Sequence, residues 1–81
     1  MVEMKIYWYG DSKNIIGEKV RELRTAHGWT QKMLAEKLQL LGYDFSDLTI
    51  LRIEQGKRFV ADYEVKGLAE VFDISADKLL K

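Results

Sequence analysis

Three glycines divide most of this sequence into segments with helical periodicity. The chain contains no proline, and Gly28, Gly42 and Gly56 each follow a stretch in which apolar residues recur with a helical period. Glycine is common just after the last turn of a helix because it adopts a left-handed backbone conformation without steric cost. The residues after each glycine differ, so the equal spacing predicts helices of similar length and not an internal repeat.

Apolar spacing and polar caps together predict five short helices. They are expected at residues 15–27, from residue 31 to about residue 41, between residues 46 and 56, at residues 63–72 and at residues 76–81. Each has a candidate N-cap with a short oxygen-bearing side chain, and these caps are Asn14, Thr30, Ser46, Asp62 and Ser75. Five helices with short connections indicate a compact all-α domain.

One side of each predicted helix carries the residues that are expected to form the core. The expected core residues are Ile16, Val20, Leu23, Leu34, Ala35, Leu38, Leu41, Ile50, Ile53, Val65, Leu68, Ala69, Phe72, Leu79 and Leu80. Two helices that meet at a steep angle need a small residue where they cross. We therefore expect Ala35 to lie at the crossing of the second and third helices.

The first thirteen residues have a different pattern. Apolar residues alternate with polar or aromatic ones over residues 2–9, VEMKIYWY, which predicts a strand and not a helix. A single strand has no partner in an otherwise helical chain. It therefore pairs with another molecule, lies on the helices or stays loose. We divide the chain into an extended arm at residues 1–13 and a helical domain at residues 14–81.

Length and composition narrow the class of protein. A chain of 81 residues is expected to form one domain, and its 47% of hydrophobic residues is ordinary for a folded one. The sequence has no cysteine, no apolar run that could span a bilayer and no signal-peptide pattern. These features predict a cytoplasmic protein.

The charges are balanced in number but not in position. Lysine and arginine total 13, as do aspartate and glutamate, so the net charge is zero. Residues 17–37 carry five basic and three acidic groups, whereas residues 62–77 carry one basic group and five acidic ones. Nucleic-acid-binding proteins usually show a basic excess or a basic patch. Here the asymmetry indicates at most one basic face.

Several linked blocks occur in a fixed order along the chain. Gln31, Leu34 and Ala35 are followed, after a connection, by Ser46, Thr49, Ile50, Ile53, Glu54 and Gly56. This pattern resembles the helix-turn-helix of the Cro and phage-repressor family of bacterial transcription regulators. The flanking segments NIIGEKVRELRTAHGWTQ, RIEQGKR and LAEVFDISADKLL are also similar to that family. The resemblance covers residues 14–81 and implies a five-helix, lambda-repressor-like DNA-binding domain.

The resemblance implies a DNA-binding surface on the second and third helices. The third helix would enter the major groove, and the N-terminus of the second helix would face a phosphate. The residues implied at this surface are Gln31, Lys32, Ser46, Asp47, Leu48, Thr49, Arg52, Lys57 and Arg58. Among the base-facing positions only Arg52 can make a bidentate contact to guanine, while Thr49 suits a thymine methyl and Asp47 a cytosine amino group.

Two features depart from the family pattern. The segment QLLGYDF separates Leu38 from Ser46, which is five residues more than the compact form has, so a wider connection is expected. The proposed reading face also carries an acidic residue, Asp47, and two leucines. Either the longer connection covers Leu48 and Leu51, or these leucines form a patch that docks a protein.

No motif for catalysis or for metal binding is present. The chain has one histidine and no cysteine, and it lacks an EF-hand-like carboxylate spacing, a glycine-rich phosphate loop and a recognisable pair of nucleophile and base. We therefore expect neither enzymatic activity nor a cofactor or metal.

The sequence favours a DNA-binding transcription regulator, specifically a repressor that reads a near-palindromic operator as a homodimer. The dimer surface is expected on the arm at residues 2–9 or on the C-terminal helix with Leu79 and Leu80. The alternative is a protein-interaction module that keeps the fold and docks a partner protein through the third helix.

Overall fold

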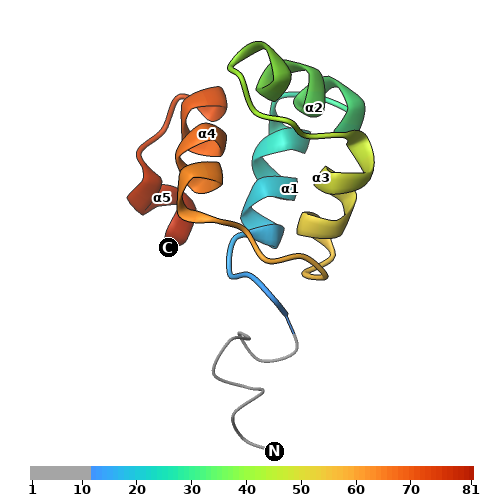
Figure 1. Cartoon of the computed structure of the whole chain (residues 1–81). Helices are drawn as coiled ribbons and strands as arrows, with labels where there is room; N and C mark the ends of the chain where they lie inside the picture. The colour runs from blue at the N-terminus through green and yellow to red at the C-terminus, as the bar shows by residue number, and fades with distance from the viewer. Residues whose placement is uncertain (1–11) are drawn as a thin grey trace, which may run out of the picture.

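The computed structural model describes residues 12–81, and these residues form five helices (Figure 1). In chain order they are α1 (Gly17–Ala26), α2 (Gln31–Leu40), α3 (Asp47–Glu54), α4 (Asp62–Phe72) and α5 (Ala76–Leu80). Helix α3 packs against α1 and α2, while α5 packs against α4 on the other side of the domain. The expected all-α architecture is confirmed. The arm predicted at residues 2–9 lies outside the described residues.

Three of the five predicted N-caps are confirmed by hydrogen bonds. The hydroxyl oxygens of Thr30, Ser46 and Ser75 accept from the backbone N–H three residues later, at the starts of α2, α3 and α5. Each bond satisfies an N–H group that has no partner within its helix. The left-handed backbone of the three dividing glycines is also confirmed, with φ of 73° at Gly28, 96° at Gly42 and 73° at Gly56.

The other two predicted caps were placed wrongly. Helix α1 begins at Gly17, and Asn14 caps it from outside: its Oδ1 accepts from the N–H groups of Ile16 (3.2 Å) and Gly17 (2.8 Å). At the start of α4, Asp62 is already the first helical residue, and its Oδ1 accepts from the next amide at 2.7 Å. There the carboxylate of Glu64 accepts from the N–H of Ala61, which precedes the helix.

The core contains most of the residues that helical spacing assigned to it. The buried hydrophobic residues are Ile16, Val20, Leu34, Ala35, Leu38, Phe45, Ile50, Ile53, Leu68, Ala69, Phe72 and Leu79. Two assignments were wrong, because Leu41 is 46% exposed and Leu80 is 44% exposed. Leu41 follows the last residue of α2, where the chain turns away from the helical face. Leu80 is the last residue of α5, and its neighbour Leu79 fills the core in its place.

A buried carboxylate joins the first three helices. Glu54 in α3 receives hydrogen bonds from Nε of Arg24 in α1 (2.6 Å) and from Nε2 of Gln31 in α2 (3.1 Å). Arg24 also donates to the carbonyl of Trp29 in the turn between α1 and α2. The side chain of Glu54 is only 4% exposed, and these bonds give its buried oxygens their hydrogen-bonding partners.

Removing one member of this ion pair is expected to destabilise the domain strongly. Glu54→Leu leaves the Arg24 side chain, which is 13% exposed, without its carboxylate, and the cost is expected to reach at most the value of about 3–5 kcal/mol for a fully buried charge. That is a large part of the stability of about 4–12 kcal/mol expected for a domain of this length. Urea unfolding of Glu54→Leu and of Arg24→Met/Glu54→Leu tests this. The double variant should recover most of the loss, and a single variant as stable as the parent would contradict a buried ion pair.

The long connection between α2 and α3 packs toward α4 and not over α3. Phe45 is buried in the core, and Gln39 donates to its carbonyl at 2.6 Å. The ring of Tyr43 lies against α4 at Gly67, where an added Cβ would come within 2.6 Å of ring carbons. The extra residues therefore pack toward α4. Figure 1 shows the connection leaving α2 at the end that lies nearer α4 and then crossing to α3.

This contact determines whether replacing Gly67 with alanine stabilises or destabilises the domain. Alanine in place of a glycine inside a helix normally stabilises it by up to about 1 kcal/mol. Gly67→Ala should instead destabilise the domain by about 1–3 kcal/mol, because the new methyl group overlaps the Tyr43 ring. In a Tyr43→Ser background the same substitution should become stabilising. Thermal melts of the four proteins measure this, and an equal effect in both backgrounds would show that the ring does not pack there.

Candidate nucleic-acid interface

Helix α3 has one buried side and one exposed side. Ile50 and Ile53 are fully buried, whereas Asp47, Leu48 and Arg52 are exposed. Leu48 and Arg52 are four residues apart, so they lie on the same side of the helix, one turn apart. An α-helix with a single exposed side of this kind fits the width of a DNA major groove.

The N-terminus of α3 is fixed by two of the predicted site residues. The Ser46 hydroxyl accepts from the N–H of Thr49 at 3.2 Å and lies 3.0 Å from the Thr49 hydroxyl. The Asp47 carboxylate accepts from the N–H of Leu48 at 2.9 Å. A negative charge in the first turn of a helix is stabilised by the positive end of the helix dipole. Asp47 therefore has a structural partner in its own helix, although its side chain remains exposed.

The predicted phosphate-facing residues differ in what they contact. Lys32, in the first turn of α2, and Lys57, just after α3, are exposed. The backbone N–H of Lys57 donates to the carbonyl of Arg52 at 2.8 Å, which fixes the chain where it leaves the helix. Gln31 is half-buried, and its side-chain amide is bonded to Glu54. Lys32 and Lys57 thus lie at the two ends of the helix-turn-helix in the sequence, and both are exposed.

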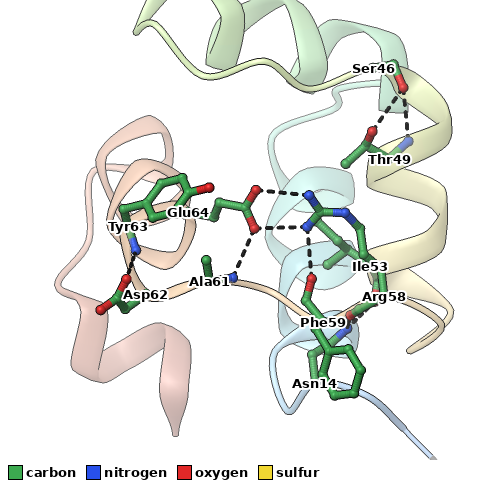
Figure 2. A network of polar contacts seen from close by, with 10 residues as sticks. All are labelled: Asn14, Ser46, Thr49, Ile53, Arg58, Phe59, Ala61, Asp62, Tyr63 and Glu64. Atoms are coloured by element: carbon green, nitrogen blue, oxygen red, sulfur yellow. Dashed lines mark hydrogen bonds and ion pairs between the residues drawn. The ribbon is translucent and has the colours of Figure 1, made fainter.

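Arg58 is held by an ion pair within the protein (Figure 2). Its two terminal nitrogens each bond one oxygen of Glu64 at 2.9 Å, and one of them also donates to the carbonyl of Phe59. Its guanidinium lies 5.5 Å from the centre of the Phe45 ring. Arg58 therefore joins the loop after α3 to the first turn of α4, a role that the sequence pattern did not indicate.

The ion pair shifts the pKa of both partners. Hydrogen bonds from Arg58 lower the pKa of the Glu64 carboxyl, burial opposes this shift, and the Ala61 N–H adds to it. The pKa of Arg58 is raised, mainly by its hydrogen bonds to Glu64. Both groups are therefore held in their charged forms at neutral pH.

The two leucines of the α3 surface differ in exposure. Leu48 is 48% exposed, because the α2–α3 connection packs toward α4 and does not cover it. Leu51 is half-buried and lines a hollow of about 220 Å³ between α1, α2 and α3. The side chains around this hollow include those of Arg21 and Gln55, both exposed, which the sequence pattern had not singled out. Their position next to Gln31 and Glu54 depends on how three helices meet, so helical spacing alone could not reveal it.

A family model described as a helix-turn-helix domain matches residues 15–80, which is most of the chain. The chain belongs to the helix-turn-helix domain family of the Cro and phage-repressor type. This confirms the family that the sequence blocks had indicated. Helices α2 and α3 are the two helices of the motif, and the protein is a DNA-binding domain of this type. No curated protein and no solved structure gives a significant match to the chain.

No helix within residues 12–81 of this helix-turn-helix protein is long and apolar enough to cross a membrane.

The Arg58–Glu64 pair is expected to make stability sensitive to acid. Because the pKa of Glu64 is lowered in the folded state, its stabilising effect is present above the unfolded-state pKa and is lost as the pH falls through the folded-state pKa. Urea unfolding from about pH 7 to about pH 3 should show a smaller loss of stability in Glu64→Gln than in the parent. Glu70→Gln, at an exposed position of the same helix, is the control and should follow the parent. Equal acid sensitivity in Glu64→Gln and the parent would refute this role.

Proposed function

We propose that this protein is a transcriptional repressor that acts in the cytoplasm and binds a near-palindromic DNA operator as a homodimer. The observation that carries the proposal is the exposed side of α3, where Leu48 and Arg52 project from a helix whose other side is fixed in the core. The family match gives DNA binding by such a helix. Reading a specific sequence requires side chains that discriminate between base edges, and Arg52 suits a guanine.

In this proposal the predicted site residues have three roles. Asp47, Leu48, Thr49 and Arg52 face the base edges, with Ser46 holding the first turn of α3 in place. Lys32 and Lys57 contact phosphates on either side of the groove, and the backbone at Gln31 faces a phosphate at the N-terminus of α2. We give Arg58 a structural role, because its terminal nitrogens are engaged by Glu64.

A dimer is proposed because one recognition helix covers few base pairs. Two copies related by a two-fold axis would place two α3 helices about 34 Å apart, in successive major grooves on one face of the duplex. The arm at residues 2–9 is one candidate for the contact between copies. The C-terminal helix is the other, although only one of its two leucines, Leu80, is exposed and Leu79 is buried.

The alternative, a protein-docking module, has two features in its favour. Leu48 is exposed in the middle of the proposed reading face, and the net charge of the chain is zero. A protein partner would bind Leu48 through apolar contacts. Its binding would not depend on a contact between Arg52 and guanine.

A salt titration distinguishes these functions. Binding to a random duplex and to a duplex selected by the protein should weaken steeply as salt increases, because each phosphate contact releases counterions. Sedimentation of the protein alone and with the selected duplex should give two copies per operator. Absence of DNA binding at low salt by a folded protein would refute the repressor proposal.

Substitutions on α3 should separate affinity from specificity. Arg52→Ala should weaken binding to the selected duplex by about 1–3 kcal/mol, because a bidentate guanine contact is lost. Asp47→Ala should tighten binding to random DNA, because a negative charge near the backbone is removed, and should lower the discrimination between duplexes.

Matched controls lie on α4. Lys66→Ala and Glu70→Ala make the same charge changes at exposed positions away from α3, and both should bind like the parent. Fluorescence anisotropy with both duplexes measures these effects. If Leu48→Ala abolishes a protein association while Arg52→Ala leaves DNA binding unchanged, the docking alternative replaces the repressor.

A further inference from the structure

We propose that Asn14 is a positioning residue for DNA binding, which holds the C-terminal end of α3 and the adjoining Lys57 in the orientation that contacts the duplex. This inference rests on the proposed function, in which α3 and Lys57 face DNA. Asn14 itself does not touch DNA in this proposal. It acts through the backbone at the point where the recognition helix ends.

The side-chain amide of Asn14 joins the start of α1 to the end of α3. Its Oδ1 accepts from the N–H groups of Ile16 and Gly17 at 3.2 and 2.8 Å. Its Nδ2 donates to the carbonyl of Ile53, in the last turn of α3, at 3.1 Å and to the carbonyl of Arg58, in the following loop, at 2.8 Å. Figure 2 shows Asn14 beside the chain at Ile53 and Arg58.

These four bonds use the full capacity of the amide. A primary amide offers two N–H donors and two acceptor lone pairs, and all four have protein partners here. No other side chain of similar size both donates twice and accepts twice in this geometry. The requirement for asparagine is therefore chemical and not only a matter of shape.

The backbones around Asn14 are packed closely on the end of α3. The N–H of Lys13 donates to the carbonyl of Gly56 at 2.8 Å. A Cβ added at Gly17 would collide with the carbonyl oxygen of Ile53, and one added at Gly56 would collide with the side chain of Ser12. Residues 12–17 thus lie directly against the exit of the recognition helix.

This packing fixes the position of Lys57. Its N–H is bonded to the carbonyl of Arg52, and the next residue is held twice: the Arg58 carbonyl by Asn14 and the Arg58 side chain by Glu64. Loss of the two bonds from Nδ2 removes the link from residue 14 to the last turn of α3 and to the loop, while the Glu54 bonds, the Lys13–Gly56 bond and the Arg58–Glu64 pair remain. Lys57 lies in the sequence between the two carbonyls that lose their donor, so its position becomes less fixed.

Asn14→Asp separates the two halves of this arrangement. The carboxylate still accepts from Ile16 and Gly17, and its charge suits the N-terminus of α1. It cannot donate, so it places a negative charge against the carbonyl oxygens of Ile53 and Arg58. The variant thus keeps the cap of α1 and releases the end of α3. Asn14→Ser, which is too short to reach both carbonyls, serves if the aspartate variant does not fold.

The test compares Asn14→Asp with a destabilised core variant, Leu68→Val in α4. Binding is measured far below the melting temperature of each protein. Asn14→Asp should bind the selected duplex about tenfold more weakly, which corresponds to one hydrogen bond to a charged group. The slope of log affinity against log salt should fall by about 1, because one phosphate contact is lost. Leu68→Val should keep the affinity and slope of the parent.

A double-mutant cycle shows whether the effect passes through Lys57. If it does, Lys57→Ala should reduce affinity in the parent and have little further effect in Asn14→Asp. Additive losses, or an Asn14→Asp variant that melts lower but keeps the parent's affinity and salt slope, would make Asn14 merely structural and overturn the inference.

Amide hydrogen exchange without DNA separates this inference from the proposed function. Exchange at residues 56–58 should be faster in Asn14→Asp than in the parent and Leu68→Val, while exchange in α1 stays unchanged. Unchanged exchange at residues 56–58 overturns the positioning role itself. A parent that binds no duplex overturns the proposed function, and the role of Asn14 toward DNA falls with it.

Discussion

The Glu54 carboxylate is the point on which the arrangement of the helix-turn-helix depends. It is almost fully buried and is shared by Arg24 of α1 and Gln31 of α2. A buried charge is tolerated only where its hydrogen-bonding partners are in place, so few relative positions of the three helices are possible. The side of α3 opposite Glu54 consequently has a defined orientation toward solvent. A surface that reads base edges needs this rigidity, because its side chains must reach particular atoms in the groove.

A second set of contacts fixes the same C-terminal end of the recognition helix and the loop that follows it. Asn14 holds the carbonyls where α3 ends, and Arg58 connects the following loop to Glu64 at the start of α4. Glu54 and this network both act on the C-terminal turn of α3, which is therefore held by contacts with α1, α2 and the segment that precedes α1. The long α2–α3 connection leaves this arrangement intact, because Tyr43 and the buried Phe45 turn its extra residues toward α4.

Much of the fold could be predicted from the sequence because its signals are local. A hydroxyl side chain starts a helix by accepting from a backbone N–H three residues later, as at Thr30 and Ser46. A glycine ends a helix through its own backbone conformation. Neither signal depends on distant parts of the chain. The errors arose where a distant contact determined the result. Asn14 caps α1 from outside the helix because its amide is also bonded to α3, and Leu41 is exposed because the connection turns toward α4 there.

For the candidate site, the sequence by itself determined the family, the five helices and the types of side chain on α3, since these follow from residue order and spacing. It also placed Arg52 and Leu48 on one side of that helix. Only the tertiary structure decided which charged residues remain available to a ligand. Arg58 and Lys57 are neighbours and both basic in the sequence, yet one is paired with Glu64 and the other is exposed. The physical reason is that an ion pair depends on the distance between side chains that belong to different helices or loops. That distance is set only when the helices have packed.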